Sequence, residues 1–293
     1  MTLKCDLQYG KGAAAFKLSR VGVRGVRKPV LVNRGEGGNA LSNTLNCDID
    51  IFVDLPGTQK GSHMSRNVEV LNEIMMESIS KPVRGMEDMC ADMCAKLLVH
   101  HEYAQTVEVH VSAEYFRKSK TPLGRDTLES YTLIGGCTQD RGEAPRRTIG
   151  VEVIGMTACP CGQQTVTEMM EFSGEMPVMT HNQRNICTLL VTTVEGESVE
   201  ADDLIDLVEA SFSSPTFELL KRPDEGQVII NAHRNTKFVE DVVRDVLSRV
   251  VESFKGLSDE TYIEVISESE ESIHKHNAYA QREGTLGEIR SEN

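Results

Sequence analysis

Hydrophobic and polar residues alternate along several stretches of the first half of the chain. An alternation of period two is typical of a strand with one buried face. Four strands are predicted in this way, at residues 20–32, 46–55, 105–115 and 128–134. Apolar residues at helical spacing predict two helices between the second and third strands, one after Ser65 and the other at residues 84–101. The predicted order is therefore strand, strand, helix, helix, strand, strand.

The second half repeats this order of elements. Strands are predicted at residues 148–156, 186–193, 261–267 and 272–280. Helices are predicted at residues 201–211 and 236–254, and the second of them has a wide apolar stripe. Two antiparallel four-stranded sheets, each with a helix pair on one face, predict an α+β protein.

The segments between these elements are interpreted as connections. Residues 135–147 resemble a linker, and they place the boundary between an N-terminal half, residues 1–138, and a C-terminal half, residues 139–293. Other connections are a short helix and loop, a charged turn and a short extended piece, at residues 163–180, 217–225 and 228–230.

Composition and charge argue against several classes of function and location. A net charge of −14 and an aromatic content of 5% argue against a nucleic-acid partner. No apolar run approaches the roughly 20 residues of a membrane helix, and the N-terminus lacks the apolar region of a signal peptide. Eight cysteines without an export signal predict reduced thiols in a cytoplasmic protein.

The most informative stretch is Met156 to Arg184, which contains the sequence CPC and the sequence THNQR. Cys159 and Cys161 are separated by one proline, and His181 follows in the polar sequence. A thiolate and an imidazole together suit zinc or ferrous iron. They equally suit an activated nucleophile or a proton donor. A turn with incidental thiols is the third interpretation of an isolated CPC.

Other polar residues could complete such a site. Glu225 ends a charged turn, Glu240 begins the strong helix, and His274 and His276 would share one face of a strand. In the first half, the loop KGSHMSR precedes a helix and could bind phosphate there. Each feature alone also has a structural interpretation, as a solvated turn, a helix-start acid, exposed histidines or an ordinary cap.

Six motifs in a fixed order carry a family resemblance: KGSHMSR, CPC, THNQR, LLKRPDE, FVED and ESIHKHNAYA. In this order the chain resembles the GTP cyclohydrolases of the prokaryotic type IB and archaeal type IV group. The likeness covers nearly the whole chain. The sequence GMTACPC and the long spacing between CPC and THNQR are more similar to the archaeal type IV enzyme, which opens methanopterin synthesis.

The resemblance implies a tunnelling fold (T-fold) with two ββααββ domains in tandem. It also implies a homodimer or homotetramer with active sites at subunit interfaces. The family's purine-binding carboxylate matches Glu240, and its metal ligands match Cys161, His181 and Glu225. Catalytic roles match Cys159 and His274, although the two cysteines could be exchanged. Candidates for the triphosphate are Lys60, His63, Arg66 and Arg184.

The implied reaction is the metal-dependent hydrolytic opening of GTP. Water attacks C8, formate is released, and the sugar rearranges to close a pterin ring. A type IV enzyme makes 7,8-dihydroneopterin 2′,3′-cyclic phosphate and diphosphate, whereas a type IB enzyme makes 7,8-dihydroneopterin triphosphate for folate or queuosine pathways. The archaeal likeness favours Fe²⁺, with Zn²⁺ or Mn²⁺ as alternatives.

Three rival hypotheses remain open at this stage. A nitrile reductase of the same fold would use a cysteine nucleophile without metal, so a fully active metal-free protein would support it. A purine- or pterin-binding protein would release no formate. A metal-stabilised structural protein would unfold when a ligand is replaced.

Overall fold

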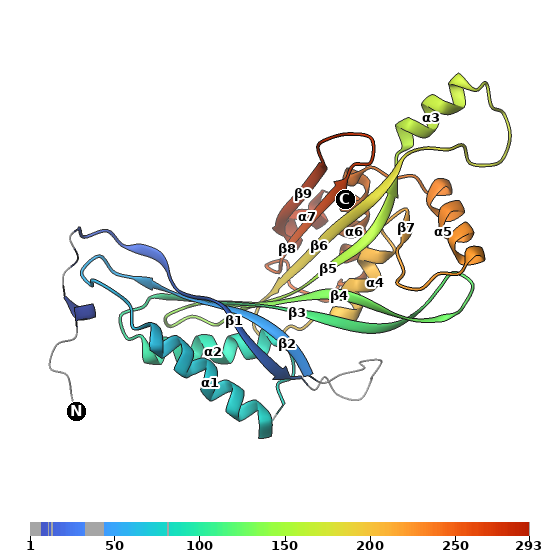
Figure 1. Cartoon of the computed structure of the whole chain (residues 1–293). Coiled ribbons are helices and arrows are strands. Elements are labelled where there is room, and N and C mark those ends of the chain that lie inside the picture. Colours follow the sequence, from blue (N-terminus) through green and yellow to red (C-terminus); the bar gives the residue numbers. More distant parts are fainter. Residues whose placement is uncertain (1–6, 11, 13, 33–43, 81, 293) are drawn as a thin grey trace.

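The computed structural model describes residues 7–10, 12, 14–32, 44–80 and 82–292. Within them the chain forms one antiparallel sheet in the order β1-β2-β3-β4-β5-β6-β8-β9, with the short β7 paired to β5 (Figure 1). The strands are β1 (Leu18–Leu31), β2 (Thr44–Leu55), β3 (Thr106–Lys120), β4 (Asp126–Asp140), β5 (Arg146–Ala158), β6 (Asn182–Thr193), β7 (Ser214–Pro215), β8 (Tyr262–Glu270) and β9 (Ala278–Thr285).

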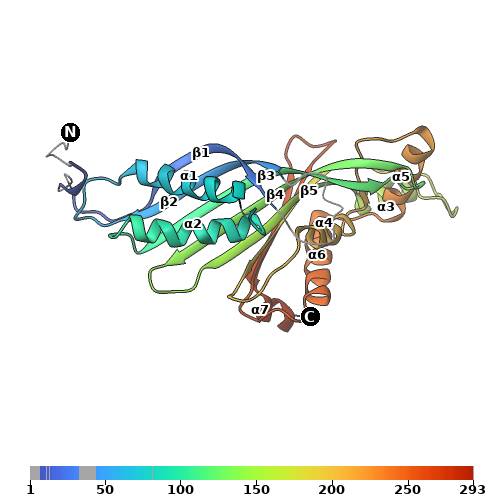
Figure 2. The ribbon, with the colours of Figure 1, turned by 90° about the horizontal axis from the view of Figure 1, so that it is seen from below.

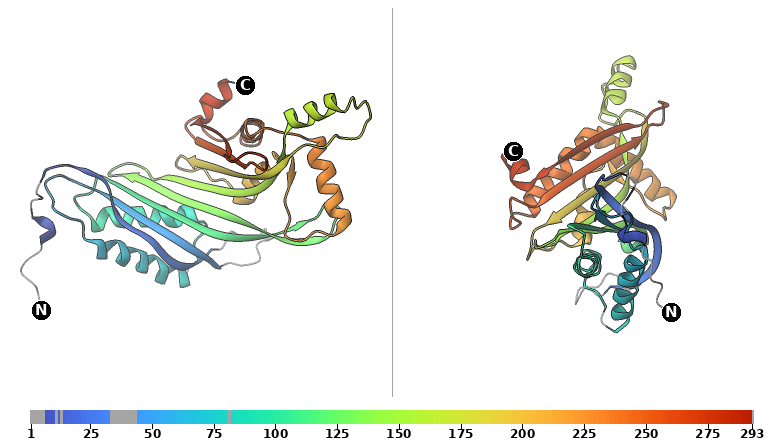
Figure 3. Two further views of the ribbon diagram at one scale, coloured as in Figure 1. Left: turned by 45° about the horizontal axis from the view of Figure 1, so that its top comes forward. Right: turned by 90° about the vertical axis from the view of Figure 1, so that its left-hand side faces the viewer.

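The helices pack mainly in two groups (Figure 2). They are the 3-10 helix η1 (Leu7–Tyr9) and the α-helices α1 (Met64–Ser80), α2 (Met86–His100), α3 (Pro160–Met169), α4 (Ala201–Glu209), α5 (Arg222–Arg234), α6 (Val239–Ser253) and α7 (Leu286–Ser291). Helix α2 packs on β3, β4 and β5, and α1 packs on α2 and β1. In the second half α4 packs on β5, and α6 packs on β8 and β9. Helix α3 projects beyond the ends of β5 and β6 (Figure 3).

Strand register explains why all of these strands share one core. Side chains directly opposite each other on paired strands point to the same face of a sheet. One row of such partners crosses six strands and is buried throughout: Cys47, Ala113, Leu133, Val151, Leu189 and Val265. The alternation seen in the sequence therefore forms one continuous apolar face under the helices, and the observed fold is α+β.

Most predicted elements are confirmed, but the linker at residues 135–147 is wrong. Strand β4 continues to Asp140 and β5 begins at Arg146. The glycines suggested a linker, yet Gly135 lies in β4 beneath the start of α2. A Cβ at Gly135 would come within 2.7 Å of the Met86 side chain. Glycine is therefore needed there for close packing, not for chain flexibility.

Three further predictions are corrected. Residues 228–230 are not extended, and the charged turn at 217–225 is helical from Arg222, because both segments run into α5. The Lys221 amide donates to the Asp224 carboxylate (3.4 Å), and Pro223 lies in the first turn, so this segment carries helix-start signals. The partner strand expected at residues 272–280 is β9, which starts only at Ala278.

The sheet passes through the expected domain boundary without a break. Residues 138 and 139 lie inside β4, which pairs with β3 and β5 on its two sides. The outer ends of the two expected halves, residues 1 and 293, lie outside the described residues. Among the helices described, none has the length and apolar character needed to cross a membrane.

Candidate active site

The register of β5 and β6 brings the CPC and THNQR motifs together. Ala158, the last residue of β5, pairs with Asn182, the first residue of β6. Just beyond this pair the Cys159 amide donates to the His181 carbonyl (3.0 Å). The Thr180 hydroxyl in turn donates to the Cys159 carbonyl (2.7 Å). Residues 22 positions apart in the sequence are therefore held side by side by backbone geometry.

Cys159 also begins helix α3. It is the N-cap residue, and its Sγ accepts a hydrogen bond from the Gly162 amide (3.3 Å). Pro160 at the first helical position suits this start because proline lacks the amide that would be unpaired there. The orientation of the Cys159 thiol is therefore set by the start of the helix.

A cavity of about 240 Å³ lies at this end of the sheet. It brings together residues from the ends of β5, β6 and β8 and from the start of α6. Its lining is Cys159, His181, Gln183, Lys237, Phe238, Val239, Glu240, Glu271, His274, His276 and Ala278. Four residues predicted from the sequence to act in the site therefore line one cavity.

The histidines of this cavity are in mutual contact. The His181 and His274 rings are perpendicular at 6.3 Å between centroids. His274 stacks on His276 at 5.1 Å. Both of these residues lie in the loop between β8 and β9, so the expected placement on a strand face is wrong, although the two rings are adjacent.

The buried carboxylate of Glu271 lies next to the His181 ring. The Glu271 side chain is 9% exposed, and its Oε2 lies 3.6 Å from His181 Nδ1. This oxygen has no hydrogen-bond partner among the described residues. His181 Nδ1 is also 3.1 Å from Gln183 Oε1. Both oxygens face Nδ1, which leaves the other ring nitrogen, Nε2, for a ligand.

The floor of the cavity is a layer of buried polar side chains on β5, β6 and β8, continuous with the apolar face. Gln183 donates to Thr157, which contacts Ser269 at 3.2 Å. Asn185 donates to Ser269 and accepts from Ser267 (2.8 and 2.9 Å). A fully hydrogen-bonded polar layer is rigid and specifies one arrangement, so Gln183 and its contact to His181 are fixed from below.

Glu240 reaches the cavity because the start of α6 is tied to β5. The Lys237 amide donates to the Ala158 carbonyl (3.0 Å). The Lys237 ammonium donates to the Ser211 carbonyl (2.9 Å) and to Asp245 (2.5 Å). Three residues later Glu240 is exposed on the first turn of α6, where the helix dipole favours a carboxylate.

Exposure separates the thiols of this site from the others. Among the described residues Cys159 is half-buried and Cys161 is exposed, whereas the remaining five cysteines are buried. Burial raises the pKa of Cys47 and of Cys187 to about 12, so neither thiol ionises readily. Cys90 and Cys94 are core residues of α2. Of the seven cysteines that the structure describes, only the two of the CPC motif have a thiol accessible to a metal or a substrate.

Comparison with known proteins identifies the family of the chain. A family model described as type I GTP cyclohydrolase folE2 matches residues 5–280. GTP cyclohydrolase MptA 1 of Methanocella arvoryzae is 39% identical, over 98% of this chain and 95% of its own length. GTP cyclohydrolase MptA of Methanothermobacter thermautotrophicus is 38% identical, over 100% of this chain and 97% of its own length. The chain belongs to the type I GTP cyclohydrolase folE2 family.

Solved structures add a likeness of fold alone. The uricase from Arthrobacter globiformis superposes with a TM-score of 0.52 at 8% identity, covering 91% of this chain and 93% of its own. At that identity the uricase informs on architecture and not on chemistry.

Two of the expected metal ligands of this family member do not line the cavity. Cys161 lies on the first turn of α3 and is exposed. Glu225 is exposed on the first turn of α5, whereas the opposite end of α5 approaches the site, with His233 Nε2 3.4 Å from the Thr180 carbonyl. Glu225 and His233 are eight residues apart on α5, which corresponds to about 12 Å along the helix axis. Among the described residues no three His, Cys, Asp or Glu side chains are grouped to hold a metal ion.

The expected phosphate-binding residues of the first half are still farther away. Val53 of β2, Val107 of β3 and Gln139 of β4 lie in one row, next to the start of β5. The loop that follows β2 therefore leaves the sheet where β5 begins, whereas the cavity lies where β5 ends. The 13 residues of β5 put about 40 Å between them. Figure 1 shows the start of α1 and helix α3 at opposite ends of the molecule.

Lys60 is exposed and His63 is half-buried in that loop, and Arg66 is half-buried in the first turn of α1. The Arg66 guanidinium donates to the His100 carbonyl (2.9 Å). Arg184 lies on β6, one residue from Gln183, and so points to the opposite face of the sheet from the cavity floor. None of these four residues lines the cavity of its own chain.

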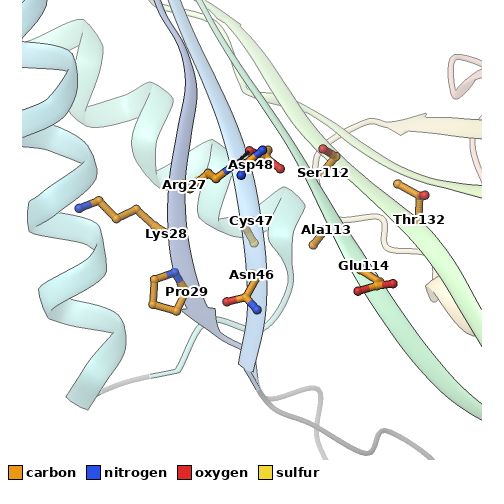
Figure 4. A pocket seen from close by; sticks show the side chains of 10 residues that line it. All are labelled: Arg27, Lys28, Pro29, Asn46, Cys47, Asp48, Ser112, Ala113, Glu114 and Thr132. Atoms are coloured by element: carbon orange, nitrogen blue, oxygen red, sulfur yellow. Dashed lines mark hydrogen bonds and ion pairs between the residues drawn. The ribbon is translucent and has the colours of Figure 1, made fainter.

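A larger hollow of about 630 Å³ lies on β1 to β4, on the sheet face opposite the helices (Figure 4). Its charged groups include Arg27 and Asp48, which pair with each other at 2.8 Å. Among the described residues that line it, the one thiol is Cys47, which is 2% exposed. It therefore lacks the available thiol and imidazole of the first cavity.

Sequence reasoning missed Glu271 and Gln183. Glu271 is the first residue of ESIHKHNAYA and directly follows an alternating strand, so its position beside the histidines was a usable signal. Gln183 belongs to the THNQR motif, but its role depends on the pairing of β5 with β6, which connects segments separated by a helix and a loop.

Proposed function

We propose that this chain is a GTP cyclohydrolase that opens the five-membered ring of guanine by hydrolysis at C8 and releases formate. The observation that carries the proposal is that four motif residues of the family, Cys159, His181, Glu240 and His274, line one cavity. Family membership and the relatives named GTP cyclohydrolase MptA support it over a nitrile reductase and over a non-catalytic purine- or pterin-binding protein.

Glu240 is the proposed guanine anchor. A carboxylate accepts two N–H donors from the edge of guanine in a bidentate arrangement, and adenine lacks this pair. The residue is exposed at the cavity and held at the start of α6 by the Lys237 contacts, so it is available to a base entering there.

The donor chemistry fits a bound Fe²⁺, with Zn²⁺ or Mn²⁺ as alternatives. Cys159 and His181 line the cavity, and the orphaned Glu271 oxygen behind His181 is the partner that an imidazole ligand commonly has. We therefore exchange the cysteine roles expected from the sequence and assign the metal to Cys159. Glu225, the third expected ligand, would come from a second copy. When bound, such a cation lowers the pKa of water and supplies the nucleophile.

The remaining steps belong to the chain's own side chains. His274, perpendicular to His181 and exposed at the cavity, takes and returns protons as one water opens the C8–N9 bond and a second water hydrolyses the remaining C8–N7 bond to release formate. His276 stacks on His274 and restricts its orientation. Glu271 and Gln183 hold His181 in place. Cys161 remains a free thiol at the rim.

The proposed product is 7,8-dihydroneopterin 2′,3′-cyclic phosphate with formate and diphosphate, the first step of tetrahydromethanopterin synthesis. The MptA relatives support this type IV reaction over the alternative, a type IB reaction that yields 7,8-dihydroneopterin triphosphate.

A homo-oligomer with interfacial sites accounts for the separation of the motifs. The KGSHMSR loop lies about 40 Å from the cavity of its own chain, so it can serve only the cavity of another copy. The order β1-β2-α1-α2-β3-β4 followed by β5, β6, helices, β8 and β9 supports two tandem T-fold halves. All seven described cysteines are free thiols, which supports a reducing, cytoplasmic location.

The test is anaerobic incubation with GTP and Fe²⁺, followed by mass analysis. The expected products are the cyclic phosphate, formate and diphosphate. A triphosphate product would keep the site and change the reaction to type IB. If GTP stayed intact with Fe²⁺, Zn²⁺ and Mn²⁺, the proposed function would be wrong.

A further inference from the structure

A chain of buried hydrogen bonds lies beneath the KGSHMSR loop. Ser62 Oγ and Tyr103 Oη are 2.7 Å apart, and Tyr103 Oη is 2.9 Å from His101 Nδ1. His101 Nε2 is 2.8 Å from Asn67 Oδ1. Ser62, Asn67 and His101 are each no more than 5% exposed. The four side chains connect the loop to the turn between α2 and β3.

Both ends of this hydrogen-bond network belong to the same segment of the polypeptide. Ser62 lies in the loop, and Asn67 lies in the first turn of α1 that follows it. His101 and Tyr103 come from the turn between α2 and β3, which is itself clamped by Arg141 through the carbonyls of Leu98, His101 and Ala104. His101 and Tyr103 therefore fix this segment at two points, Ser62 and Asn67, against a rigid support.

Burial keeps this connection uncharged. His101 is fully buried, and this burial, together with the neighbouring Arg66, His100 and His63, lowers its pKa to about 4. Apolar side chains could fill the same space at lower desolvation cost. A polar chain instead specifies one geometry, because each member must meet its partner.

The backbone of the loop is held as well. The amides of Lys60 and Gly61 donate to the Gln8 carbonyl (3.1 and 3.2 Å). On the other side Arg66 donates to the His100 carbonyl. Ser62 is the point where the side-chain network meets the loop, between Lys60 and His63. The position of these two residues therefore depends on the Tyr103 hydroxyl.

We propose that His101 and Tyr103 are positioning residues that hold the KGSHMSR loop in the shape that takes the phosphate chain of the substrate. The proposal rests on the proposed function, because it assumes that the loop meets the triphosphate of GTP bound to another copy. Fixing the loop before binding removes the entropy cost of ordering it around the anion. Loss of the network should therefore weaken substrate binding and leave the chemical step in place.

The test is Tyr103→Phe, which removes one hydroxyl and keeps the ring. KM for GTP should rise about tenfold, the effect of one lost hydrogen bond of this kind, while kcat stays within about twofold. The matched control is Tyr131→Phe, which removes a buried hydroxyl bonded to Glu209 at 2.7 Å, far from the loop. The control should leave KM unchanged. An unchanged KM in Tyr103→Phe, or an equal rise in the control, would overturn the proposal.

A second variant covers the case in which Tyr103→Phe fails to fold. Ser62→Ala removes the loop end of the network and should raise KM by a similar factor. Where Tyr103→Phe folds, combining the two substitutions should raise KM little beyond either one alone. Binding of inorganic triphosphate, measured by calorimetry, should weaken in parallel. This binding does not require GTP turnover. Wild-type protein that binds triphosphate but leaves GTP intact would therefore refute the proposed function while the positioning role was still tested.

Discussion

Cys159 and Cys161 are one residue apart but differ in surroundings. Cys159 caps α3 and lines the cavity beside His181, whereas Cys161 is exposed on the first turn of that helix. Cys159→Ser should lower Fe²⁺ affinity by more than about 100-fold, the upper effect of a residue that only supports a ligand. A serine still caps the helix, so the fold should survive.

The matched control is Cys161→Ser, which should retain Fe²⁺ stoichiometry in equilibrium dialysis. The reverse pattern, with iron lost from Cys161→Ser and kept by Cys159→Ser, would restore the assignment expected from the sequence. Sequence spacing could not decide between the thiols because the two are chemically identical. The helix start and the pairing of β5 with β6 distinguish them.

His101 makes stability depend on pH. Its pKa is about 4 in the folded protein, below the value of 6.5 expected in the unfolded chain. The unfolded state therefore binds more protons as the pH falls from 6.5 towards 4, and the free energy of unfolding should decrease by up to roughly 3 kcal/mol. Denaturant unfolding at several pH values should show this decrease in the wild type.

His101→Gln removes the titrating group and keeps a polar side chain. The difference in unfolding free energy between wild type and variant should change between pH 6.5 and 4 and stay constant above pH 7. A constant difference across the whole range would show that His101 does not titrate in this way. The groups facing His101, namely Arg66, His100, His63 and Tyr103, are present in both proteins.

At the scale of elements, the end of β5 depends on a glycine. A Cβ at Gly155 would come within 2.1 Å of the Phe212 ring, and Phe212 is 2% exposed. The carbonyl of Phe212 accepts from Asn235, and that of Ser211 from Lys237, just before α6. The contact between Gly155 and Phe212 therefore packs β5 against the segment that carries Glu240.

Gly155→Ala should lower the free energy of unfolding by about 1–3 kcal/mol, as expected for overpacking. Gly226→Ala is the comparison, because Gly226 lies in α5 with nothing within 4 Å of an added Cβ. That change should raise stability by about 0.4–1 kcal/mol. Chemical denaturation of both variants measures these changes in the free energy of unfolding. A Gly155→Ala protein as stable as wild type would show that Phe212 moves aside freely.

The elements were largely predictable because a buried face imposes a period on the sequence. The alternation at residues 105–115 and the apolar stripe at 236–254 correspond to β3 and α6. Prediction was wrong at Gly135 and at residues 228–230, where close packing or helix-start signals decided the structure. The cavity could be anticipated only through the family motifs, since Glu271 and the polar floor depend on long-range strand pairing.

At the scale of the whole molecule, the chain separates the parts that one substrate would need. The cavity lies at one end of β5, and the KGSHMSR loop leaves the sheet at the other end, about 40 Å away. A guanine on Glu240 and a triphosphate on Lys60 of the same chain cannot belong to one GTP. If both groups bind one GTP, as proposed, each site combines the cavity of one copy with the loop of another.

Mixing two inactive variants tests this requirement most directly. Cys159→Ala disables the cavity and leaves the loop intact, and the double variant Lys60→Ala, His63→Ala does the reverse. Each should be inactive alone, and coexpression at equal amounts should restore about a quarter of the wild-type activity per site, because one site in four combines an intact cavity with an intact loop. If the coexpressed variants were as inactive as each variant alone, the whole site would lie within one chain, and the proposed site between copies would be wrong.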